Sequence, residues 1–240
     1  MTRPWSVAHR GFSARCTENT VTSHRAAIEA GADLVETDAR LSADGEVFCI
    51  HDPDLTRVAG LDLPVAEATS AELDKISLPG NQHLMRLPAF LAAVRSDAGI
   101  LIDVKTPEPE LVERLLEDIA AHSDNPNIWL GLRALPQLRL LRQRSTLRCV
   151  ALLADYDEAE PWMAAGADAL RVWEGEFSET IEARLAALAP IWITAGGRET
   201  PDKPGDIPMG RLRQLVRRRV QAILLNDPTM IAEAVCEGAP

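Results

Sequence analysis

The sequence predicts an α/β fold in which eight parallel strands alternate with helices and close into one (β/α)8 TIM barrel over residues 1–240. Two observations support this prediction. The 240 residues show no break in composition, and short apolar runs alternate eight times with longer amphipathic segments. The main alternative is an open doubly wound sheet, which usually has fewer strands and a glycine-rich first turn. The sequence contains no G-x-G-x-x-G pattern, so we prefer the barrel.

The expected strands are short apolar runs spaced along the whole chain. They are Trp5–His9, Leu34–Asp38, Ile100–Lys105, Ile128–Leu132, Leu147–Leu153, Ala169–Trp173, Ile191–Ala195 and Ala222–Leu225. The helices expected after them carry apolar residues at helical spacing. They are Val21–Ala30, Pro88–Ser96, Glu110–His122, Leu135–Arg144, Tyr156–Ala165, Ser178–Leu188, Met209–Arg218 and Pro228–Glu237.

One stretch departs from this alternation, an insertion spanning about residues 40–87 after the second expected strand. Asp44-Gly45 lies between two short apolar runs and predicts a hairpin turn that needs positive φ. From residue 53 to 87 the segment is loop-rich, with a short helix expected near residues 70–76. Loops at this end of a barrel carry function.

Composition limits the classes of partner. Hydrophobic residues make up 46% and charged residues 25%, as in soluble globular proteins. The net charge of −11 disfavours nucleic acid and anionic membrane surfaces. The basic run Arg211–Arg219 is expected to be the solvated side of a helix whose Leu212, Leu215 and Val216 face inward. We therefore expect no nucleic acid partner and no stable membrane association, and the oligomeric state stays open.

The amino terminus and the cysteines favour a cytoplasmic protein. The start, MTRPWSVAHRGF, lacks the apolar region of a signal peptide, and no run of apolar residues is long enough to span a membrane. The four cysteines, Cys16, Cys49, Cys149 and Cys236, are scattered and form no C-x-x-C pair. This spacing suits neither a zinc site nor a disulfide framework and fits a reducing compartment.

Charged residues gather where neighbouring apolar runs end. These strand-end groups are His9-Arg10-Gly11, Glu36-x-Asp38, His51-Asp52 and Asp103-x-Lys105. Residues two apart in a strand share a face, so each spaced pair is expected to point into the barrel mouth. Taken singly, such residues are commonly caps or salt-bridge partners. Four groups at inward positions of neighbouring strands are costly unless they are paired or bind a ligand, and this joint placement favours a functional site.

Three of these residues form an all-oxygen pocket. Glu36, Asp38 and Asp103 offer carboxylates suited to a hard divalent cation such as Mg²⁺ or Ca²⁺. Close carboxylates repel one another, so either a metal ion or the cations Arg10 and Lys105 must offset their charge.

Two histidines flank the same mouth. His9 and His51 have side chains that titrate near neutrality, so one can deliver a proton while the other removes one. Arg10 offers a planar fork for phosphate oxygens and Lys105 a point charge. A metal site, two cations and an acid/base pair are what displacement at a phosphodiester requires.

In order and spacing, these motifs are similar to those of the glycerophosphodiester phosphodiesterase family. The matching motifs are His9-Arg10-Gly11, Glu18-Asn19-Thr20, Ala30-Gly31-Ala32-Asp33, Glu36-x-Asp38, Asp44-Gly45, His51-Asp52 and, more weakly, Leu87-Pro88, Asp103-x-Lys105 and Leu225-Asn226-Asp227-Pro228. The resemblance implies a barrel enzyme of lipid and glycerol metabolism. It implies hydrolysis of a small phosphodiester to sn-glycerol 3-phosphate and an alcohol with one divalent cation, Mg²⁺ or Ca²⁺.

The resemblance also assigns roles residue by residue. It implies Glu36, Asp38 and Asp103 as metal ligands. It implies His9 and His51 as the catalytic acid/base pair, Arg10 as a phosphate contact and Lys105 as a further charge beside the metal. Supporting roles fall to Glu18, which would orient the first loop and hold Arg10, and to Asp52. Whether water or the 2-hydroxyl of the substrate attacks stays open, since an intramolecular attack would gain from proximity.

The chain departs from the family pattern in three places. Thr17 replaces a usual proline, and Asp103 replaces a usual glutamate, which shortens the reach by about 1.5 Å. Trp192 lies in a seventh strand that matches loosely. It is a candidate contact for the glycerol moiety, with a core position as the alternative, and Trp173 is equally ambiguous. These changes leave the head-group preference open. They also leave two alternatives to hydrolysis, a phosphate-ester sensor and a lysophospholipase D-like or cyclising lyase.

Overall fold

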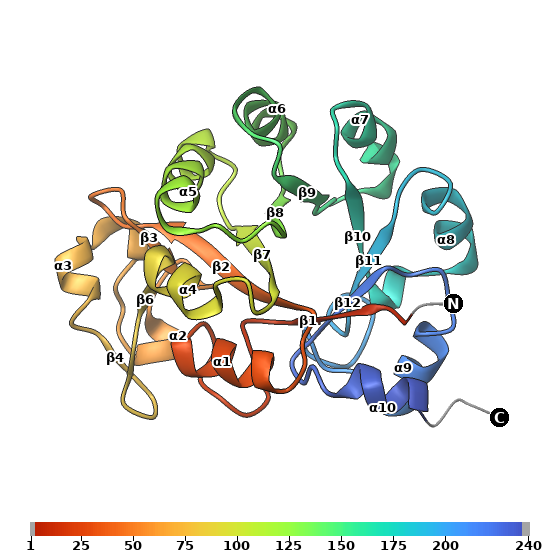
Figure 1. The fold of residues 1–240 in the computed structure, drawn as a ribbon, viewed down its shortest axis with the longest axis horizontal. Coiled ribbons are helices and arrows are strands. Elements are labelled where there is room, and N and C mark those ends of the chain that lie inside the picture. Colours follow the sequence, from red (N-terminus) through yellow and green to blue (C-terminus); the bar gives the residue numbers. More distant parts are fainter. Residues whose placement is uncertain (1–2, 237–240) are drawn as a thin grey trace.

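Eight parallel strands close into a barrel in the computed structural model, which describes residues 3–236 (Figure 1). The strands are β1 (Trp5–Ala8), β2 (Leu34–Leu41), β7 (Gly99–Val104), β8 (Ile128–Leu132), β9 (Arg148–Ala151), β10 (Ala169–Trp173), β11 (Ile191–Thr194) and β12 (Ala222–Leu225). Their order around the barrel is β1-β12-β11-β10-β9-β8-β7-β2, and pairing of β1 with β2 completes the ring. The predicted fold class is confirmed. Seven of the eight strands end within two residues of their expected bounds, and β2 continues three residues further, to Leu41.

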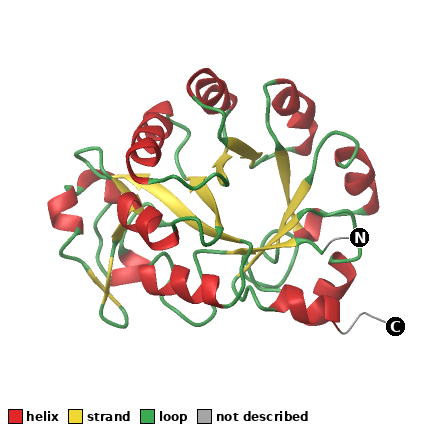
Figure 2. Cartoon of the chain, in the orientation of Figure 1, coloured by secondary structure: helices red, strands yellow, loops and turns green. Residues whose placement is uncertain are grey.

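Helices surround the strands on the outside (Figure 2). They are α1 (Val21–Glu29), α4 (Leu87–Val94), α5 (Pro109–His122), α6 (Leu135–Arg144), α7 (Ala159–Ala164), α8 (Glu179–Leu185), α9 (Met209–Leu215) and α10 (Met230–Cys236). Proline lies in the first turn of α4, α5 and α6, where its missing N–H costs nothing. Glu237, the last residue of the final expected helix, lies outside the described residues. Within residues 3–236, no helix is both long and apolar enough to cross a bilayer.

Several expected helices are shorter than predicted: α8 ends at Leu185 and α9 at Leu215, each three residues early. The segment expected as a helix over residues 156–165 begins as a 3₁₀ turn, Tyr156–Glu158, and becomes α-helical only at Ala159. The side chain of Asp155 accepts a hydrogen bond from the backbone N–H of Asp157, and this cap favours the tighter turn at the start.

The basic run folds as expected. Leu212 and Leu215 of α9 are buried, while two of the arginines form ion pairs on the outside of the barrel. Arg211 lies 2.9 Å from Glu174, and Arg218 lies 2.7 Å from Glu182. The run therefore covers the outside of α9 and of the turn that follows it.

The insertion extends the barrel sheet and has a small core of its own. Its elements are β3 (Val47–Cys49), α2 (Thr56–Ala59), a 3₁₀ turn (Val65–Glu67), α3 (Ser70–Leu73), β4 (Ser77–Leu78), β5 (Gln82–His83) and β6 (Met85–Arg86). Strand β3 pairs antiparallel with the end of β2, and β6 pairs with β3. The expected turn is present, with Gly45 at φ 81°. Phe48, Leu55 and Leu73 are fully buried in the core of the insertion.

Tryptophans fill the amino-terminal half of the barrel interior. The rings of Trp5, Trp129 and Trp192 pack together, with centroids 4.8 to 6.3 Å apart. They belong to a buried cluster with Val7, Leu101 and apolar residues of the other strands. Because this half is packed solid, the interior opens only at the carboxyl ends of the strands, which is where barrel enzymes place their sites.

Candidate active site

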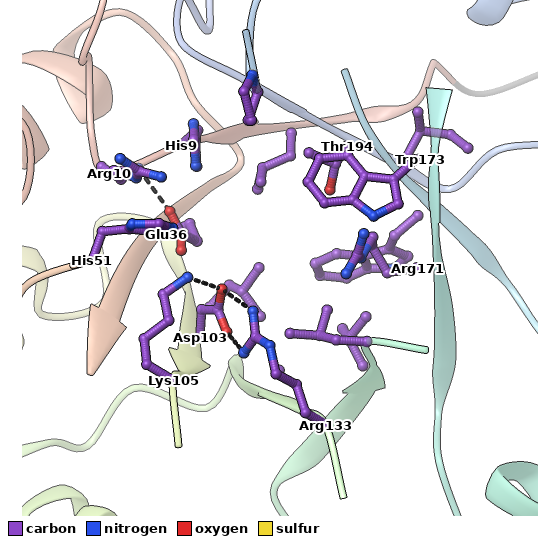
Figure 3. Close-up of a pocket in the computed structure, with 18 residues that line it drawn as sticks. His9, Arg10, Glu36, His51, Asp103, Lys105, Arg133, Arg171, Trp173 and Thr194 are labelled. Atoms are coloured by element: carbon purple, nitrogen blue, oxygen red, sulfur yellow. Dashed lines mark hydrogen bonds and ion pairs between the residues drawn. The ribbon is translucent and has the colours of Figure 1, made fainter. Parts of the chain in front are cut away.

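A cavity of about 180 Å³ opens at the carboxyl ends of the barrel strands (Figure 3). One side, which we call the carboxylate wall, is formed by His9, Arg10, Glu36, His51, Asp103 and Lys105. The opposite side, which we call the Trp173 wall, is formed by Arg171, Trp173 and Thr194 of β10 and β11. The floor is apolar, and among the described residues none from 53 to 87 lines the cavity. The loop-rich part of the insertion, residues 53–87, therefore does not fold into the cavity, whereas His51 before it lines one wall.

The His9-Arg10-Gly11 motif shapes the turn after β1. Arg10 and Gly11 both have positive φ, at 57° and 79°. A Cβ atom at residue 11 would lie 2.3 Å from Oγ of Ser23, so only glycine fits this turn. The backbone N–H of Arg10 donates to Oε2 of Glu36 at 2.7 Å. The turn thus positions the Arg10 side chain and holds the Glu36 carboxylate of β2 by a backbone hydrogen bond.

The Glu18-Asn19-Thr20 motif attaches the first loop to β2. Asn19 donates to Oδ2 of Asp38 at 2.7 Å and accepts from the hydroxyl of Thr37 at 2.9 Å. Thr20 caps α1 by accepting a hydrogen bond from the backbone N–H of Ser23. Asn19 belongs to the motif, but no pattern in the sequence assigns it a role at Asp38.

The three predicted metal ligands converge. Glu36, Asp38 and Asp103 each place a carboxylate oxygen within 4.8 Å of the others. The sheet register explains this, because Asp38 lies directly opposite Asp103 on the neighbouring strand β7. Glu36 and Asp38 are fully buried.

Three cations offset this cluster. Lys105 Nζ lies 2.7 Å from Oδ1 of Asp38 and 2.5 Å from Oδ2 of Asp103. Arg10 Nε lies 3.3 Å from Oδ2 of Asp38. Arg133, at the end of β8, grips both oxygens of Asp103, with Nη2 at 2.9 Å from Oδ2. Arg133 was not predicted, although its place just after a strand could have drawn attention to it.

The carboxylates do not titrate alike. Burial alone would raise the pKa of Asp38 and of Asp103, but Lys105 lowers both, with help from Arg10 at Asp38 and from Arg133 at Asp103. Burial raises the pKa of Glu36 well above its ordinary value, and the charges of Asp38 and Asp103 raise it further. Asp38 and Asp103 are therefore ionised, whereas Glu36 is the carboxyl group that favours its protonated form and would ionise when a cation binds nearby.

Both histidines are oriented through Nδ1. His9 Nδ1 lies 2.7 Å from Oδ1 of Asn226, and His51 Nδ1 lies 2.7 Å from Oδ1 of Asp52. The amide of Asn226 donates to Asp206 at 2.8 Å, which fixes its oxygen toward His9. Each ring therefore carries its proton on Nδ1, and within residues 3–236 neither Nε2 has a hydrogen-bond partner. Asn226 follows β12, which barrel closure brings beside β1.

The two rings differ in charge preference. Burial and the nearby Arg10 lower the pKa of His9 to about 4, so this ring is neutral at pH 7. Burial and Lys105 also lower the pKa of His51, while the contact with Asp52 works in the opposite direction. His51 is thus the ring with a carboxylate to stabilise its protonated form.

Arg57 of the insertion joins the supporting residues. Its Nε lies 2.5 Å from Asp52, and its two terminal nitrogens lie 2.9 and 2.7 Å from Glu18. Glu18 in turn accepts from Nη1 of Arg10 at 3.0 Å. This chain of ion pairs runs from His51 through Asp52 to Arg10. No sequence pattern pointed to Arg57, because its place depends on how the irregular insertion folds.

Trp192 lies in the cavity floor and the barrel core. Its ring is 3% exposed, and Nε1 donates to Gln221 at 2.8 Å. The second tryptophan considered in the sequence, Trp173, stands higher on the opposite side of the cavity, with the guanidinium carbon of Arg171 4.4 Å from the centre of its ring. Trp173, rather than Trp192, therefore presents its side chain on a cavity wall.

Comparisons with known proteins agree with the motifs. The sequence model of the Glycerophosphoryl diester phosphodiesterase family matches residues 9–174. A glycerophosphodiester phosphodiesterase of Caldanaerobacter subterraneus subsp. tengcongensis is 25% identical over 255 residues, covering 97% of this chain and 98% of that protein. A probable glycerophosphodiester phosphodiesterase 1 of Mycobacterium tuberculosis is 43% identical over 131 residues, 48% of this chain and 47% of that protein.

Solved structures share the fold. A glycerophosphodiester phosphodiesterase of Agrobacterium tumefaciens aligns with a TM-score of 0.77 at 25% identity, covering 97% of this chain and 100% of that one. An Oleispira antarctica phosphodiesterase, solved with the product sn-glycerol-3-phosphate, has a TM-score of 0.83 at 19% identity, covering 98% and 97%. The family match includes every residue of the carboxylate wall and most of the chain. The chain therefore belongs to the glycerophosphoryl diester phosphodiesterase family and is an enzyme of that class.

Proposed function

We propose that the protein hydrolyses small glycerophosphodiesters to glycerol 3-phosphate and an alcohol, using one divalent cation and the His9/His51 pair. A single observation carries the proposal. Three carboxylates lie within 4.8 Å of one another, and two of them, Glu36 and Asp103, line the same cavity wall as two histidines. The Nδ1 atoms of these histidines are fixed, and their Nε2 atoms have no described partner. That set combines a cation site with an acid and a base.

The residues present fit a hard divalent cation, either Mg²⁺ or Ca²⁺. All three ligand candidates are carboxylates. Oδ1 of Asp38 is buried and accepts no hydrogen bond of good geometry, so it keeps a lone pair for a further cation. When bound, such an ion would polarise the phosphoryl oxygen and stabilise the negative charge of the transition state. Glu36, Asp38 and Asp103 are the residues that would hold it.

The histidines supply the proton transfers. His9 is neutral at pH 7, so its Nε2 can take the proton of the attacking hydroxyl. His51 keeps its Nδ1 proton on Asp52, and this carboxylate stabilises the imidazolium that delivers a proton from Nε2 to the departing alkoxide. After one reaction His9 has gained a proton and His51 has lost one, so the number of protons on the pair is unchanged. The same roles serve attack by water or by the 2-hydroxyl of the substrate.

Arg10 is placed to contact the phosphate. Glu18 holds its Nη1 and Asp38 lies beside its Nε. Its Nη2 has no partner within residues 3–236 and can donate to a phosphate oxygen. Lys105 adds a fixed positive charge on the same wall. The apolar floor with Trp192 and the open mouth suit a small molecule as substrate.

The test is release of glycerol 3-phosphate from glycerophosphocholine and glycerophosphoglycerol, with Mg²⁺ or Ca²⁺ and after chelation. We expect turnover that chelation abolishes and either ion restores. Absence of turnover on any glycerophosphodiester with any divalent ion would refute the proposal. A cyclic glycerophosphate among the products would identify the cyclising course, in which the 2-hydroxyl attacks.

A second candidate is a sensor that binds phosphate esters without turnover. The arrangement of Asp103 favours it, since this shorter carboxylate is held by both Lys105 and Arg133. A sensor would bind the diester with no product released, and a His9→Ala variant would bind as well as the parent. The two oriented histidines favour the enzyme, because a binding protein needs no proton transfer.

A further inference from the structure

Two hydrogen-bond donors of the Trp173 wall have no acceptor among the described residues. Nη1 of Arg171 and Nε1 of Trp173 are both buried, and neither has a hydrogen-bond partner within the described residues. The two side chains lie against each other on the cavity surface (Figure 3). Buried donors are nearly always paired in native proteins, so two adjacent unpaired donors facing a cavity indicate a ligand that supplies the acceptors.

Arg171 also lacks a counter-charge in the part of the chain that the structure describes. Arg10, Lys105 and Arg133, the other described cations of this cavity, each lie within ion-pair distance of a carboxylate, and Arg171 does not. Its strongest electrostatic attraction is to Asp103, whose oxygens Lys105 and Arg133 already occupy. A desolvated cation without a partner is costly, and an anionic ligand would remove that cost.

The local backbone is built to hold Trp173 in place. Gly197 has φ 76°, and a Cβ atom there would lie 2.5 Å from Cζ3 of the Trp173 ring. The ring therefore sits directly on the backbone of the loop after β11. Arg198 reaches the same ring, with its guanidinium carbon 5.9 Å from the ring centre. A tryptophan fixed this closely, with cations around it, offers no free face to a quaternary ammonium group.

The wall faces the reacting end from across the barrel. Four steps around the ring separate β10 from β2, so Arg171 stands diametrically opposite the strand that carries Glu36 and Asp38. Figure 3 shows Arg171, Trp173 and Thr194 on one side and Glu36, His51 and Lys105 on the other. A diester phosphate at the carboxylate wall would leave the Trp173 wall to the far end of the substrate.

We propose that Arg171 and Trp173 form an anion subsite, and that the preferred substrates are phosphodiesters whose far end carries a carboxylate or a phosphate group. The proposal rests on the phosphodiesterase function proposed above and adds the substrate class. Arg171 and Trp173 would donate to the oxygens of that group. Choline and ethanolamine esters would place a cation against a cation, so they would be the poorer substrates.

The decisive comparison uses esters that differ only in charge. Glycerol phosphodiesters of 3-hydroxypropionate and of 3-hydroxypropanamide have the same shape, and the diester of 3-hydroxypropyl phosphate tests phosphate against carboxylate. We expect kcat/KM for one or both anionic esters to exceed that of the amide by about tenfold or more, the effect of a charge-assisted hydrogen bond. A ratio near one for both anionic esters would overturn the proposal.

Variants assign the preference to the wall. Arg171→Met should bring the ratio of anionic to amide ester close to one, Arg171→Lys should keep part of it, and Trp173→Phe should lower it while keeping the ring. The matched control is Arg148→Met, because Arg148 also stacks on a tryptophan, 5.1 Å from the Trp129 ring, but lies outside the cavity. An unchanged ratio in Arg171→Met would refute the subsite. Any contact of Arg171 with the substrate would then be to a group that all the esters share.

The subsite can fail separately from the reaction. If no ester is hydrolysed, the proposed function fails, but calorimetric binding of the non-hydrolysable phosphonate analogues of the propionate and propanamide esters still tests the wall. Tighter binding of the propionate analogue, lost in Arg171→Met, would support the subsite without turnover. Equal binding of the two analogues by the unmodified protein would refute it.

Discussion

The two walls of the cavity treat their charges differently. On the carboxylate wall, Asp103 forms ion pairs with Lys105 and Arg133, and Glu36 accepts a hydrogen bond from the backbone N–H of Arg10. On the Trp173 wall, Arg171 has no acidic partner and Trp173 has no acceptor for its N–H among residues 3–236. The cations of the carboxylate wall have carboxylate partners within the described chain, whereas the Trp173 wall would receive its partners from the substrate. We therefore assign the reaction to residues of the carboxylate wall and the choice of substrate to residues of the Trp173 wall.

The chain connects each wall in its own way. The carboxylate wall is tied together by side chains from the first loop, the insertion and β7, and Arg57 links two of these segments. The Trp173 wall comes from two adjacent strands, with Trp173 directly opposite Thr194 in the register. Changes on the first wall therefore spread through an ion-pair network, while changes on the second stay local.

The largest effect should come from the histidines of the carboxylate wall. His9→Asn and His51→Asn each remove a proton-transfer group and should lower kcat by about 10²- to 10⁴-fold. Steady-state kinetics on a glycerophosphodiester measures this, and thermal unfolding checks that the fold is kept. His83→Asn is the control, because His83 is exposed on β5 and away from the cavity. Activity within a few-fold of the parent in either site variant would remove the histidines from the mechanism.

A second prediction contrasts the walls in stability. Lys105→Met leaves Asp38 and Asp103 short of a partner and should lower the free energy of unfolding by about 3 kcal/mol. Arg171→Met should change it by less than about 1 kcal/mol, because the lost stacking on Trp173 is offset by removal of an unpaired buried cation. Urea unfolding with a chelator present measures both. Equal losses would mean that Arg171 has a structural partner.

The sequence was sufficient where strand geometry alone decides position. Glu36 and Asp38 share a face because side chains alternate along a strand, and Asp103 lies beside them because parallel neighbours end at the same edge. The same alternation would have placed Arg171 inward with Trp173, since the two residues lie two apart in β10. That inference was open to sequence reasoning and was missed.

Other parts of the site depend on contacts that no local pattern encodes. Asn226 reaches His9 only because closure of the barrel sets β12 beside β1. Arg57 reaches Glu18 and Asp52 only because the insertion packs its own core around Leu55 and folds back to the rim. Such contacts follow from tertiary packing of irregular chain, which short-range rules do not fix.

The third prediction breaks the link between the insertion and the carboxylate wall. Arg57→Met frees Asp52 and Glu18 from a shared partner, so His51 and Arg10 lose their common support. We expect kcat to fall by about tenfold, the lower end of what misplaced catalytic groups cost. KM should change less, and Arg57→Lys should recover part of the rate.

The control for this variant is another exposed ion pair. Arg25→Met removes a pair with Asp97 at 2.8 Å, of similar exposure but far from the cavity. Its kcat should match the parent. A normal kcat in Arg57→Met, or an equal loss in Arg25→Met, would show that the ion-pair chain does not position the histidines.

The smallest effect concerns acid stability beneath the carboxylate wall. His24 of α1 is fully buried against Phe90, and neither ring nitrogen has a hydrogen-bond partner in the described chain. Burial lowers the pKa of His24 to about 3. Between this value and the ordinary 6.5 the unfolded chain binds the extra proton, so folding stability falls as the pH drops through that window and is unaffected above it.

His24→Leu removes this liability while keeping an apolar side chain of similar size. Acid unfolding followed by circular dichroism should therefore show a midpoint lower by roughly half a pH unit. At pH 8, where histidine is neutral in both the folded and the unfolded chain, the stability of the variant should differ from that of the parent only by the effect of the changed packing. Arg171 on the Trp173 wall has its pKa lowered by burial only to about 10, so Arg171→Met should leave the acid midpoint where it is. A midpoint that moves in Arg171→Met but not in His24→Leu would contradict this assignment. A group lowers folding stability in this pH range only if the unfolded chain binds its proton there and the folded chain does not, as expected for a buried histidine.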